Sequence, residues 1–515
     1  MELYLIVVAV LFGLAITDLI VGVSNDAVNF LNSAIGSRVS SKKVIMIIAS
    51  IGILLGVTFS NGMMEVARKG IFHPQYFIVT ELLVIFLAVM LTDIILLDFF
   101  STFGLPTSTT VSIVFELLGA AVAVSVIKII QMGQDMSELV NYINTAKALA
   151  IISGILLSIV FAFSFGALVQ WIVRLVFTFD FKEKVKKYGS IYGGIAMMTI
   201  TFFILIKGAK GSSWMTVEMI DWISHHTLVI LGASFLIWTV LLQLLHWFVK
   251  FNILKFIVLA GTGALAMAFA ANDLVNFIGV PLAGFNAYKI ALLNSGDPLS
   301  TSMAAMAGKV HTDTWMLLIA GLIMVVTLWV SKKAKTVIET SLSLSRQHEG
   351  EERFEVLSFS RPIVKMGINL AEAVGKWIPN TLRRGIANRF NDENAVEQAI
   401  KDRPAFDIVR ASSILIVASA LISFGTSLKL PLSTTYVTFM VAMGASLADK
   451  AWGRESAVYR ISGVFTVIGG WFLTAFIAFT VAFIFAILLY FFKLPAIILL
   501  VCFAVFMIYQ TYKIH

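Results

Sequence analysis

A short polar segment interrupts an apolar run in the middle of this chain, and its residue types could bind ions. Asn272 and Asp273 follow the apolar residues 256–271, and Asn276 lies four positions after Asn272, so both amides share one face of a helix. Carboxylate and amide groups are costly to place at membrane depth, where they indicate a functional site. Their oxygens are the ligands that a hard cation prefers. In a transporter the natural candidate is Na⁺.

The same arrangement occurs near the N-terminus, where Asn25, Asp26 and Asn29 follow the mostly apolar run 3–21. Two copies of a costly feature call for one explanation. We expect both copies to line cation sites, where a co-transported cation neutralises the carboxylates so that an anion can approach. The alternative is that these side chains only hold neighbouring helices together through polar contacts.

Each polar segment is followed, further along the chain, by a Pro-x-Ser-Thr-Thr segment that is typical of a helix start. Proline is favoured in the first turn, and Ser or Thr supplies the N-cap. The free backbone N–H groups and the helix dipole then attract an anion. Two such helix starts that face each other could hold one tetrahedral oxyanion, whereas either alone could be an ordinary N-cap. The hydroxyl groups concerned belong to Ser108, Thr109, Thr110, Ser433, Thr434 and Thr435.

The spacing of these segments indicates a duplicated chain. Asp26 and Ser108 are 82 positions apart, Asp273 and Ser433 are 160 apart, and the difference is close to the 75 residues of the polar segment 332–406. An odd number of spans between the two Asn-Asp segments would invert one half. We therefore expect an all-α polytopic membrane protein with two inverted repeats of about 5–6 spans each. Broken or re-entrant helices at the substrate site complete the architecture of a secondary transporter.

The composition independently places the chain in a membrane. Of its 515 residues, 59% are hydrophobic and only 13% are charged, whereas a soluble domain is about half apolar and a quarter charged. We expect roughly 10 to 12 spans of about 20 residues in the lipid bilayer of the plasma (inner) membrane. The net charge of +8 is attributed to loop Lys and Arg that orient the helices, and not to nucleic-acid binding. A lone cysteine, Cys502, allows no disulfide framework.

The chain is divided into five parts. Residues 1–178 form the first transmembrane repeat, 179–250 the linking transmembrane spans, and 251–331 the first part of the second repeat. The polar segment 332–406 has no run long enough to span, and its amphipathic stretch 363–390 predicts a helix on the membrane surface, on the cytoplasmic side. Residues 407–515 form the second part of the second repeat.

Other polar residues carry weaker predictions. Asp18, Glu81, Asp93, Asp98 and Glu116 lie in or near apolar runs but occur in one copy, so each could bind a proton or a cation or be an ion partner. The histidines show no metal-ligand spacing, and the absence of a phosphate loop argues against direct ATP drive. Neither a nucleophile–base pair nor a cofactor motif is present, so we expect no enzyme and no cofactor beyond the co-transported ion.

At its paired motifs the chain resembles the inorganic phosphate transporter (PiT) family. The family's hallmark is a duplicated GANDVAN-type motif, each copy followed by Pro-x-Ser-Thr-Thr, and the copies here are residues 22–29 (GVSNDAVN) and 270–276 (AANDLVN). The resemblance covers both membrane halves and not segment 332–406. It implies symport of inorganic phosphate with Na⁺, or with H⁺ in some members. It also implies phosphate at the six hydroxyl residues above and cations at Asn25, Asp26, Asn29, Asn272, Asp273 and Asn276.

The chain departs from the family pattern at several positions. Val111 and Tyr436 stand where the family usually has His, and Ala270 replaces the leading glycine of the second motif. Sulfate permeases occur among the relatives, so a symporter of sulfate or another tetrahedral oxyanion is the alternative. An anion channel is less favoured, because paired carboxylates would repel a permeating anion. The sequence leaves a homo-oligomer open.

Overall fold

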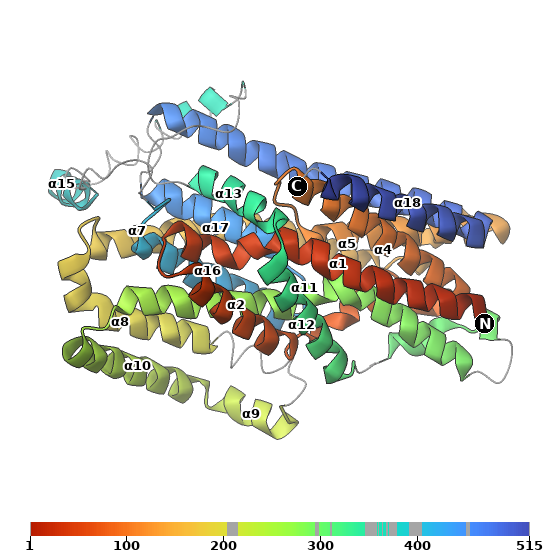
Figure 1. The fold of residues 1–515 in the computed structure, drawn as a ribbon, viewed down its shortest axis with the longest axis horizontal. Helices are drawn as coiled ribbons and strands as arrows, with labels where there is room; N and C mark the ends of the chain where they lie inside the picture. The colour runs from red at the N-terminus through yellow and green to blue at the C-terminus, as the bar shows by residue number, and fades with distance from the viewer. Residues whose placement is uncertain are drawn as a thin grey trace.

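The computed structural model describes residues 2–202, 215–293, 298–308, 312–345, 358, 360–362, 364–366, 369, 379–390, 404–449 and 454–513. These residues form a bundle of helices, most of them aligned with one long axis (Figure 1). Eight of the described helices are long and apolar enough to cross a membrane, or nine if a bent pair counts as one span. The chain is therefore an all-α, multi-pass integral membrane protein.

The predicted count of 10 to 12 spans exceeds this number, partly because one helix is too long for a single crossing. α18 covers 59 residues and contains a non-helical residue, Lys493 (φ 46°), inside it. The kink at Lys493 divides it into two helices, and since a span needs about 20 residues, its 59 residues suffice for two crossings. α2, with 16 residues, falls below the length of a full crossing.

The first half contains long helices joined by short ones, and the break after α4 is the one that matters for the site. Gly104 has a positive φ of 64° there, and Pro106 cannot continue a helix. The elements are α1 (Glu2–Gly36), α2 (Lys42–Val57), η1 (Asn61–Met64), α3 (Glu65–Lys69), η2 (Pro74–Tyr76), α4 (Val79–Thr102), α5 (Thr109–Gln131), η3 (Met136–Glu138), α6 (Leu139–Tyr142) and α7 (Thr145–Phe177).

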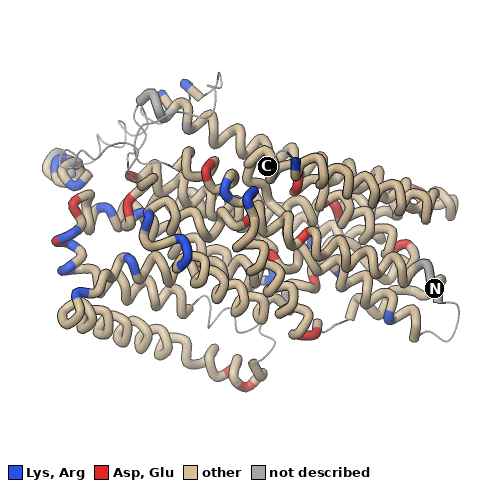
Figure 2. Tube along the Cα trace, in the orientation of Figure 1, with Lys and Arg blue, Asp and Glu red and all other residues tan. Residues whose placement is uncertain are grey.

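The second half follows three linking helices, α8 (Lys182–Thr201), α9 (Val217–His225) and α10 (Thr227–Val249), of which α9 and α10 lie at the edge of the bundle (Figure 1). Its own elements are α11 (Ile253–Leu292), η6 (Pro298–Ser300), η7 (Met303–Ala307), α12 (Thr314–Val330), α13 (Lys333–Ser345), α15 (Asn380–Arg389), α16 (Ile408–Ser427), α17 (Thr434–Ala448) and α18 (Arg454–Tyr512). Lys and Arg gather at one end of the bundle, around α15 and the start of α8 (Figure 2).

The two helices that carry the Asn-Asp segments pack against each other in opposite directions. Near one end of α1, Phe12 and Phe285 have ring centroids 5.6 Å apart. Further along α1, Phe30 lies 5.1 Å from Phe269, which comes earlier in α11. Because the partner moves back along α11 as α1 advances, α1 and α11 are antiparallel, and their Asn-Asp segments meet near the middle of the contact.

The two halves are also interleaved through a matched pair of glycines. A Cβ on Gly119 of α5 would lie 2.2 Å from the backbone oxygen of Phe479 in α18, and one on Gly444 of α17 would lie 2.1 Å from that of Phe163 in α7. Gly119 and Gly444 stand at the same distance along the chain from Ser108 and Ser433. Each Pro-x-Ser-Thr-Thr helix therefore packs tightly against a helix of the other half.

Part of segment 332–406, for which no span is predicted, lies inside the bundle. α13 packs against α1 inside the bundle, with Val337, Ile338 and Leu344 buried, because these apolar residues share one helical face. α3 packs against α11 at the corresponding point of the first half. Residues 333–345 therefore belong to the bundle, and the membrane-surface placement, which concerns residues 363–390, stays a prediction. Of the amphipathic stretch 363–390, α15 is helical, and most of residues 363–378 lie outside the described part of the chain.

Candidate functional site

Both Asn-Asp segments lie inside continuous helices. All six of their Asn and Asp side chains are buried, and Asp26 and Asp273 are 0% exposed. Because α1 and α11 run unbroken through these segments, their backbone carbonyls stay in helical hydrogen bonds. The helix breaks that the sequence predicts lie instead after α4 and after α16.

Those breaks end in two helix starts of the predicted kind. The Ser108 hydroxyl accepts a hydrogen bond from the Val111 amide at 3.1 Å, and the Ser433 hydroxyl accepts one from the Tyr436 amide at 3.1 Å. The Ser N-caps are thus confirmed. The prolines do not lie in the first turn, since each comes two residues before its N-cap, where it stops the preceding segment from entering a helix.

The Asp26 carboxylate is held by hydroxyl groups from both helix starts. Thr109 of α5 donates to it at 2.9 Å, and Thr435 of α17 donates at 3.0 Å. The Asn29 amide, one turn further along α1, adds a longer contact of 3.4 Å. One carboxylate of the first half is therefore bound by both halves.

The Asp273 carboxylate has the reciprocal set of partners. Thr434 of α17 donates to it at 2.6 Å, and Thr110 of α5 donates at 2.9 Å. The amides of Asn272 and Asn276 add contacts of 2.9 Å and 3.0 Å. Four threonines and two carboxylates thus form one cluster, in which each carboxylate takes one hydroxyl from each half; we call Asp26, Asp273, Thr109, Thr110, Thr434 and Thr435 the central cluster.

Asn25 and Asn272 form hydrogen bonds with the loops at the two helix breaks and so connect these loops to the central cluster. The Asn25 side chain accepts from the Thr107 amide at 3.1 Å and donates to the Leu105 carbonyl at 3.2 Å. The Asn272 amide donates to the Leu432 carbonyl at 2.7 Å. Their predicted role as cation ligands stays a prediction, while the contacts show that they position the two loops that precede α5 and α17.

The central cluster has little free space around it. A cavity of about 10 Å³ lies beside it, lined by Asn29, Asn32, Thr435 and Ser341 among others. That is about the volume that admits a single water molecule, and a tetrahedral oxyanion does not fit. The described conformation therefore holds the site closed around its own side chains.

The site is bordered by two further residues, Ser341 and Trp471, which the sequence analysis did not single out. Ser341 of α13 accepts a hydrogen bond from Asn32 at 3.0 Å. Trp471 of α18 stacks on Tyr436, with ring centroids 3.8 Å apart, and its indole N–H donates to the Pro106 carbonyl at 3.2 Å. A tryptophan inside an apolar run needs an acceptor for its N–H. That need was the one signal in the sequence that could have pointed to Trp471.

The single-copy acids divide into two groups. Asp98 pairs with Lys333 at 2.6 Å and Glu81 pairs with Lys128 at 2.9 Å, so both are ion partners. Asp18, Asp93 and Glu116 are fully buried, and apart from a hydrogen bond from Ser112 to Glu116 their carboxylate oxygens have no hydrogen-bond donor. In the part of the chain that the structure describes, no group of His, Cys, Asp or Glu has the arrangement of a metal site.

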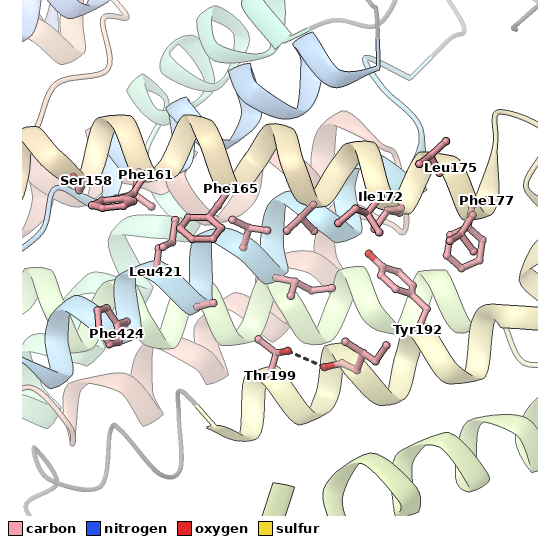
Figure 3. Close-up of a pocket in the computed structure, with 18 of the residues that line it drawn as sticks. Ser158, Phe161, Phe165, Ile172, Leu175, Phe177, Tyr192, Thr199, Leu421 and Phe424 are labelled. Atoms are coloured by element: carbon pink, nitrogen blue, oxygen red, sulfur yellow. Dashed lines mark hydrogen bonds between the residues drawn. The ribbon is translucent and has the colours of Figure 1, made fainter. Parts of the chain in front are cut away.

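A large cavity lies away from the central cluster. It is a groove of about 1460 Å³ between α7, α8 and α16, lined mostly by apolar side chains such as Phe161, Phe165 and Ile172 (Figure 3). It touches the functional site only through the loop before α17, where Leu432 lines its wall. Its volume therefore does not measure the substrate site.

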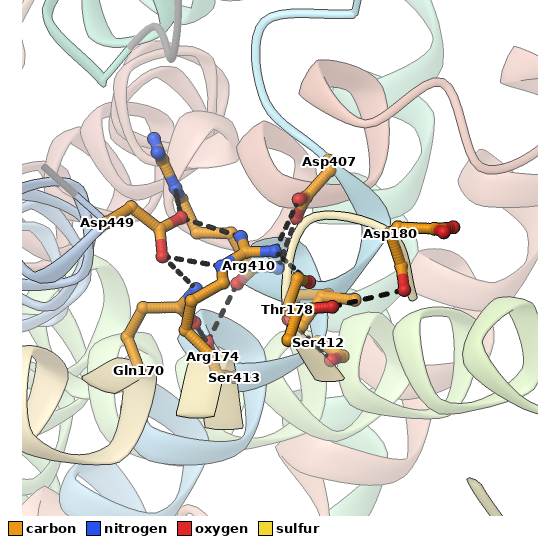
Figure 4. A network of polar contacts seen from close by, with 10 residues as sticks. Gln170, Arg174, Thr178, Asp180, Asp407, Arg410, Ser412, Ser413 and Asp449 are labelled. Atoms are coloured by element: carbon orange, nitrogen blue, oxygen red, sulfur yellow. Dashed lines mark hydrogen bonds and ion pairs between the residues drawn. The ribbon is translucent and has the colours of Figure 1, made fainter. Parts of the chain in front are cut away.

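A second buried ionic cluster joins α7 to α16 and α17 (Figure 4). Arg174 forms a bidentate pair with Asp449, with both N···O distances 2.8 Å, and pairs with Asp407 at 2.8 Å. Arg410 reaches Asp449 at 2.8 Å, and Gln170 donates to it at 2.8 Å. We call Gln170, Arg174, Asp407, Arg410 and Asp449 the arginine cluster.

Comparisons with known proteins agree with this geometry. Residues 22–341 match the model of the phosphate transporter family. A Thermococcus kodakarensis protein that carries the name phosphate permease is 25% identical over 90% of this chain and 94% of its own length, and a Pyrococcus abyssi protein of the same name is 27% identical over 58% of this chain and 68% of its own. A solved sodium-dependent phosphate transporter shares the fold, with a TM-score of 0.62 and 16% identity over 95% of this chain and 99% of that one. The family match spans more than half of the residues and includes both Asn-Asp segments, so the chain belongs to the phosphate transporter family.

Proposed function

We propose that this protein imports inorganic phosphate across the plasma (inner) membrane by symport with Na⁺. Phosphate transport follows from the family, which consists of transporters and not of enzymes. The observation that carries the choice of symport is the charge of the central cluster. Among the described residues its two buried carboxylates are held by hydroxyls and amides, and no Lys or Arg forms an ion pair with either.

This arrangement requires a cation before an anion can bind. Two unit charges of the same sign 4 Å apart repel by about 4 kcal/mol at an effective dielectric constant of 20, so phosphate beside Asp26 and Asp273 is strongly disfavoured. A monovalent cation on the carboxylate oxygens removes that repulsion and takes the oxygen ligands that it prefers. Cation binding would thus precede or accompany phosphate binding.

The threonine hydroxyls can then donate hydrogen bonds to the anion. In the described conformation Thr109, Thr110, Thr434 and Thr435 each donate to a carboxylate. Once a cation occupies the carboxylate oxygens, the same hydroxyls can turn toward phosphate. The first backbone N–H groups of α5 and α17 have no acceptor within their helices, and they add donors with the favourable dipole of a helix start.

Opening the site would separate elements of the two halves. The cavity at the cluster holds about one water molecule, so phosphate needs the helix starts of α5 and α17 to move apart. These helices pack against α18 and α7, helices of the opposite halves. A relative motion of the interleaved halves would therefore open the cluster.

Uptake of labelled phosphate into proteoliposomes tests the proposal, with Na⁺ and H⁺ gradients imposed separately. We expect an inward Na⁺ gradient to drive accumulation above equilibrium. Accumulation with a proton gradient alone would assign the coupling to H⁺, and equilibration without accumulation would indicate a channel. Excess sulfate that abolishes phosphate uptake would favour the alternative substrate class.

A further inference from the structure

The groove between α7, α8 and α16 has the length and lining of a site for hydrocarbon chains. Ser158 and Phe177 both line it (Figure 3), and along α7 they are about 28 Å apart. Leu157, Phe161 and Phe165 present exposed apolar surface to it. An exposed apolar groove nearly as long as a bilayer is thick suits an acyl chain better than a water-soluble ligand.

One end of the groove is basic. Arg389 of α15 lines this end and donates to the Leu175 carbonyl at 3.0 Å. Tyr188 of α8 also lines it, and the Lys187 ammonium lies 5.2 Å from the centre of its ring. Further Lys and Arg gather around α15 and the start of α8, at this end of the bundle (Figure 2).

Among the residues that the structure describes near this end, the acidic ones do not cancel its charge. Glu183 pairs with Lys186, and Asp180 is the other acid between α7 and α8. Lys187 and Arg389 therefore remain as cations beside the groove. A basic site at the end of an apolar groove matches a lipid whose headgroup is negatively charged.

The other end of the groove reaches the loop that builds half of the phosphate site. Leu430 and Leu432 of that loop line the groove, as does Val437 in α17. The Leu432 carbonyl accepts from Asn272 at 2.7 Å and from Thr110 at 3.2 Å. Whatever fills the groove therefore packs against the residue whose backbone anchors the Asp273 side of the central cluster.

We propose that this groove binds one anionic phospholipid, with its headgroup at Lys187 and Arg389 and its acyl chains along α7 toward Leu432. Burial of each methylene group favours the bound chain, and the charged end selects the headgroup. By packing against the loop before α17, the lipid holds the Asp273 half of the cluster in place. This second effect rests on the proposed transport function, whereas lipid binding does not.

Native mass spectrometry of the full-length protein in detergent tests the binding, with phosphatidylglycerol and phosphatidylcholine of identical chains as probes. We expect one phosphatidylglycerol to stay bound and to raise the thermal midpoint by several degrees, with at least about a fivefold preference over phosphatidylcholine. The paired substitution Lys187→Gln and Arg389→Gln should remove the preference. Lys147→Gln, at the opposite end of α7, is the matched control and should keep it.

A second variant tests the groove itself. Ala420→Phe places a ring among the lining residues of α16 and should abolish retention of both lipids, whereas Leu236→Phe on the exposed face of α10 should not. Equal retention of the two lipids by the wild type, or unchanged phosphatidylglycerol binding in Ala420→Phe, would overturn the proposal.

Uptake measurements separate the lipid site from the transport proposal. We expect phosphate uptake to be several-fold faster in phosphatidylglycerol liposomes than in phosphatidylcholine liposomes, and the double Gln variant to lose that difference. Equal rates in both liposomes with lipid still bound would refute the effect on the central cluster. Selective lipid binding with no uptake under any gradient would refute the transport proposal and leave the lipid site standing.

Discussion

The central cluster and the arginine cluster each hold two carboxylates that lie far from each other in sequence, but they compensate the charge in opposite ways. Asp26, Asp273 and Asp449 are buried, whereas the Asp407 side chain is 18% exposed. Asp407 and Asp449 face the guanidinium groups of Arg174 and Arg410. Among the described residues, Asp26 and Asp273 accept hydrogen bonds only from neutral donors. Hydroxyls and amides satisfy the hydrogen bonds of a carboxylate but leave its charge.

In the proposed mechanism, this difference separates a structural contact from a cation site. A buried ion pair is self-contained, and removal of one partner leaves an uncompensated charge that destabilises the fold. The carboxylates of the central cluster would instead be neutralised by a cation that binds and leaves during transport. We therefore expect changes in the central cluster to act mainly on transport and changes in the arginine cluster to act mainly on stability.

The largest expected effect is on transport by Asp273→Asn. The amide keeps the size of the side chain but removes the charge that attracts the cation, so Na⁺-driven phosphate uptake in proteoliposomes should fall to background. The thermal midpoint should stay the same or rise, because a buried charge disappears.

Ser433→Ala is the comparison variant for this test. It removes an N-cap and one hydroxyl of the proposed phosphate site, and we expect it to weaken phosphate affinity while the dependence of uptake on Na⁺ concentration is kept. If Asp273→Asn and Ser433→Ala changed the Na⁺ dependence equally, separate cation and anion sites would be excluded.

The next largest effect is on stability by Arg174→Met. This substitution leaves Asp449 and Asp407 without one of their cations, and breaking a buried pair costs about 3–5 kcal/mol. Denaturant titration of the protein in detergent measures the loss. Lys186→Met, which removes an exposed pair with Glu183, is the control and should cost less than about 1 kcal/mol. A loss for Arg174→Met as small as that of the control would refute the contrast between the clusters.

A smaller effect tests whether the two halves are matched around the central cluster. Gly119→Ala and Gly444→Ala would each place a Cβ within 2.2 Å of a backbone oxygen in the opposite half, and overpacking of this kind costs about 1–3 kcal/mol. We expect similar falls in thermal midpoint from the two substitutions. Gly232→Ala, where a Cβ meets nothing within 4 Å, is the control. A large difference in thermal midpoint between Gly119→Ala and Gly444→Ala would mean that the two contacts do not contribute equally to stability, so that the halves are not matched.

The features that could be predicted are those in which polar residues stand out against an apolar background. Asp26, Asp273 and the two Ser N-caps are of this kind, and the duplication linked them before any contact was known. Their pairing across the halves, with one hydroxyl from each helix start on each carboxylate, depends on the packing of α1 against α11 and could not be derived from spacing. The inverted orientation of the complete halves stays a prediction.

Other features could not be predicted because the local composition indicated a different structure. α13 was placed with a polar segment since its neighbours are charged, although Val337, Ile338 and Leu344 recur at helical spacing and are buried in the bundle. Arg174 and Asp449 are too far apart in sequence for any pattern to pair them. Both residues close apolar segments, where a charged side chain would ordinarily be taken for an interface residue.

The smallest expected effect concerns an exposed ion pair between the halves. Lys429, in the loop before α17, pairs with Glu65 of α3 at 3.1 Å, and Lys69 also pairs with Glu65. Partial burial alone would raise the pKa of Glu65, but hydrogen bonds from the ammonium groups of Lys429 and Lys69 outweigh it and lower the pKa from 4.5 to about 2. Since the pKa is lower in the folded protein, the stabilisation is complete above about pH 4.5 and is lost as the pH falls toward 2.

Glu65→Gln measures this contribution. At pH 7 it should lower the stability by less than about 1 kcal/mol, because solvent screens an exposed pair. The difference between wild type and variant in thermal midpoint should shrink as the pH falls from 4.5 toward 2, because the unfolded chain binds the proton first and folded Glu65 becomes protonated, and so resembles Gln, only near pH 2. A difference that stayed constant or grew over this range would show that the carboxylate charge does not hold the loop.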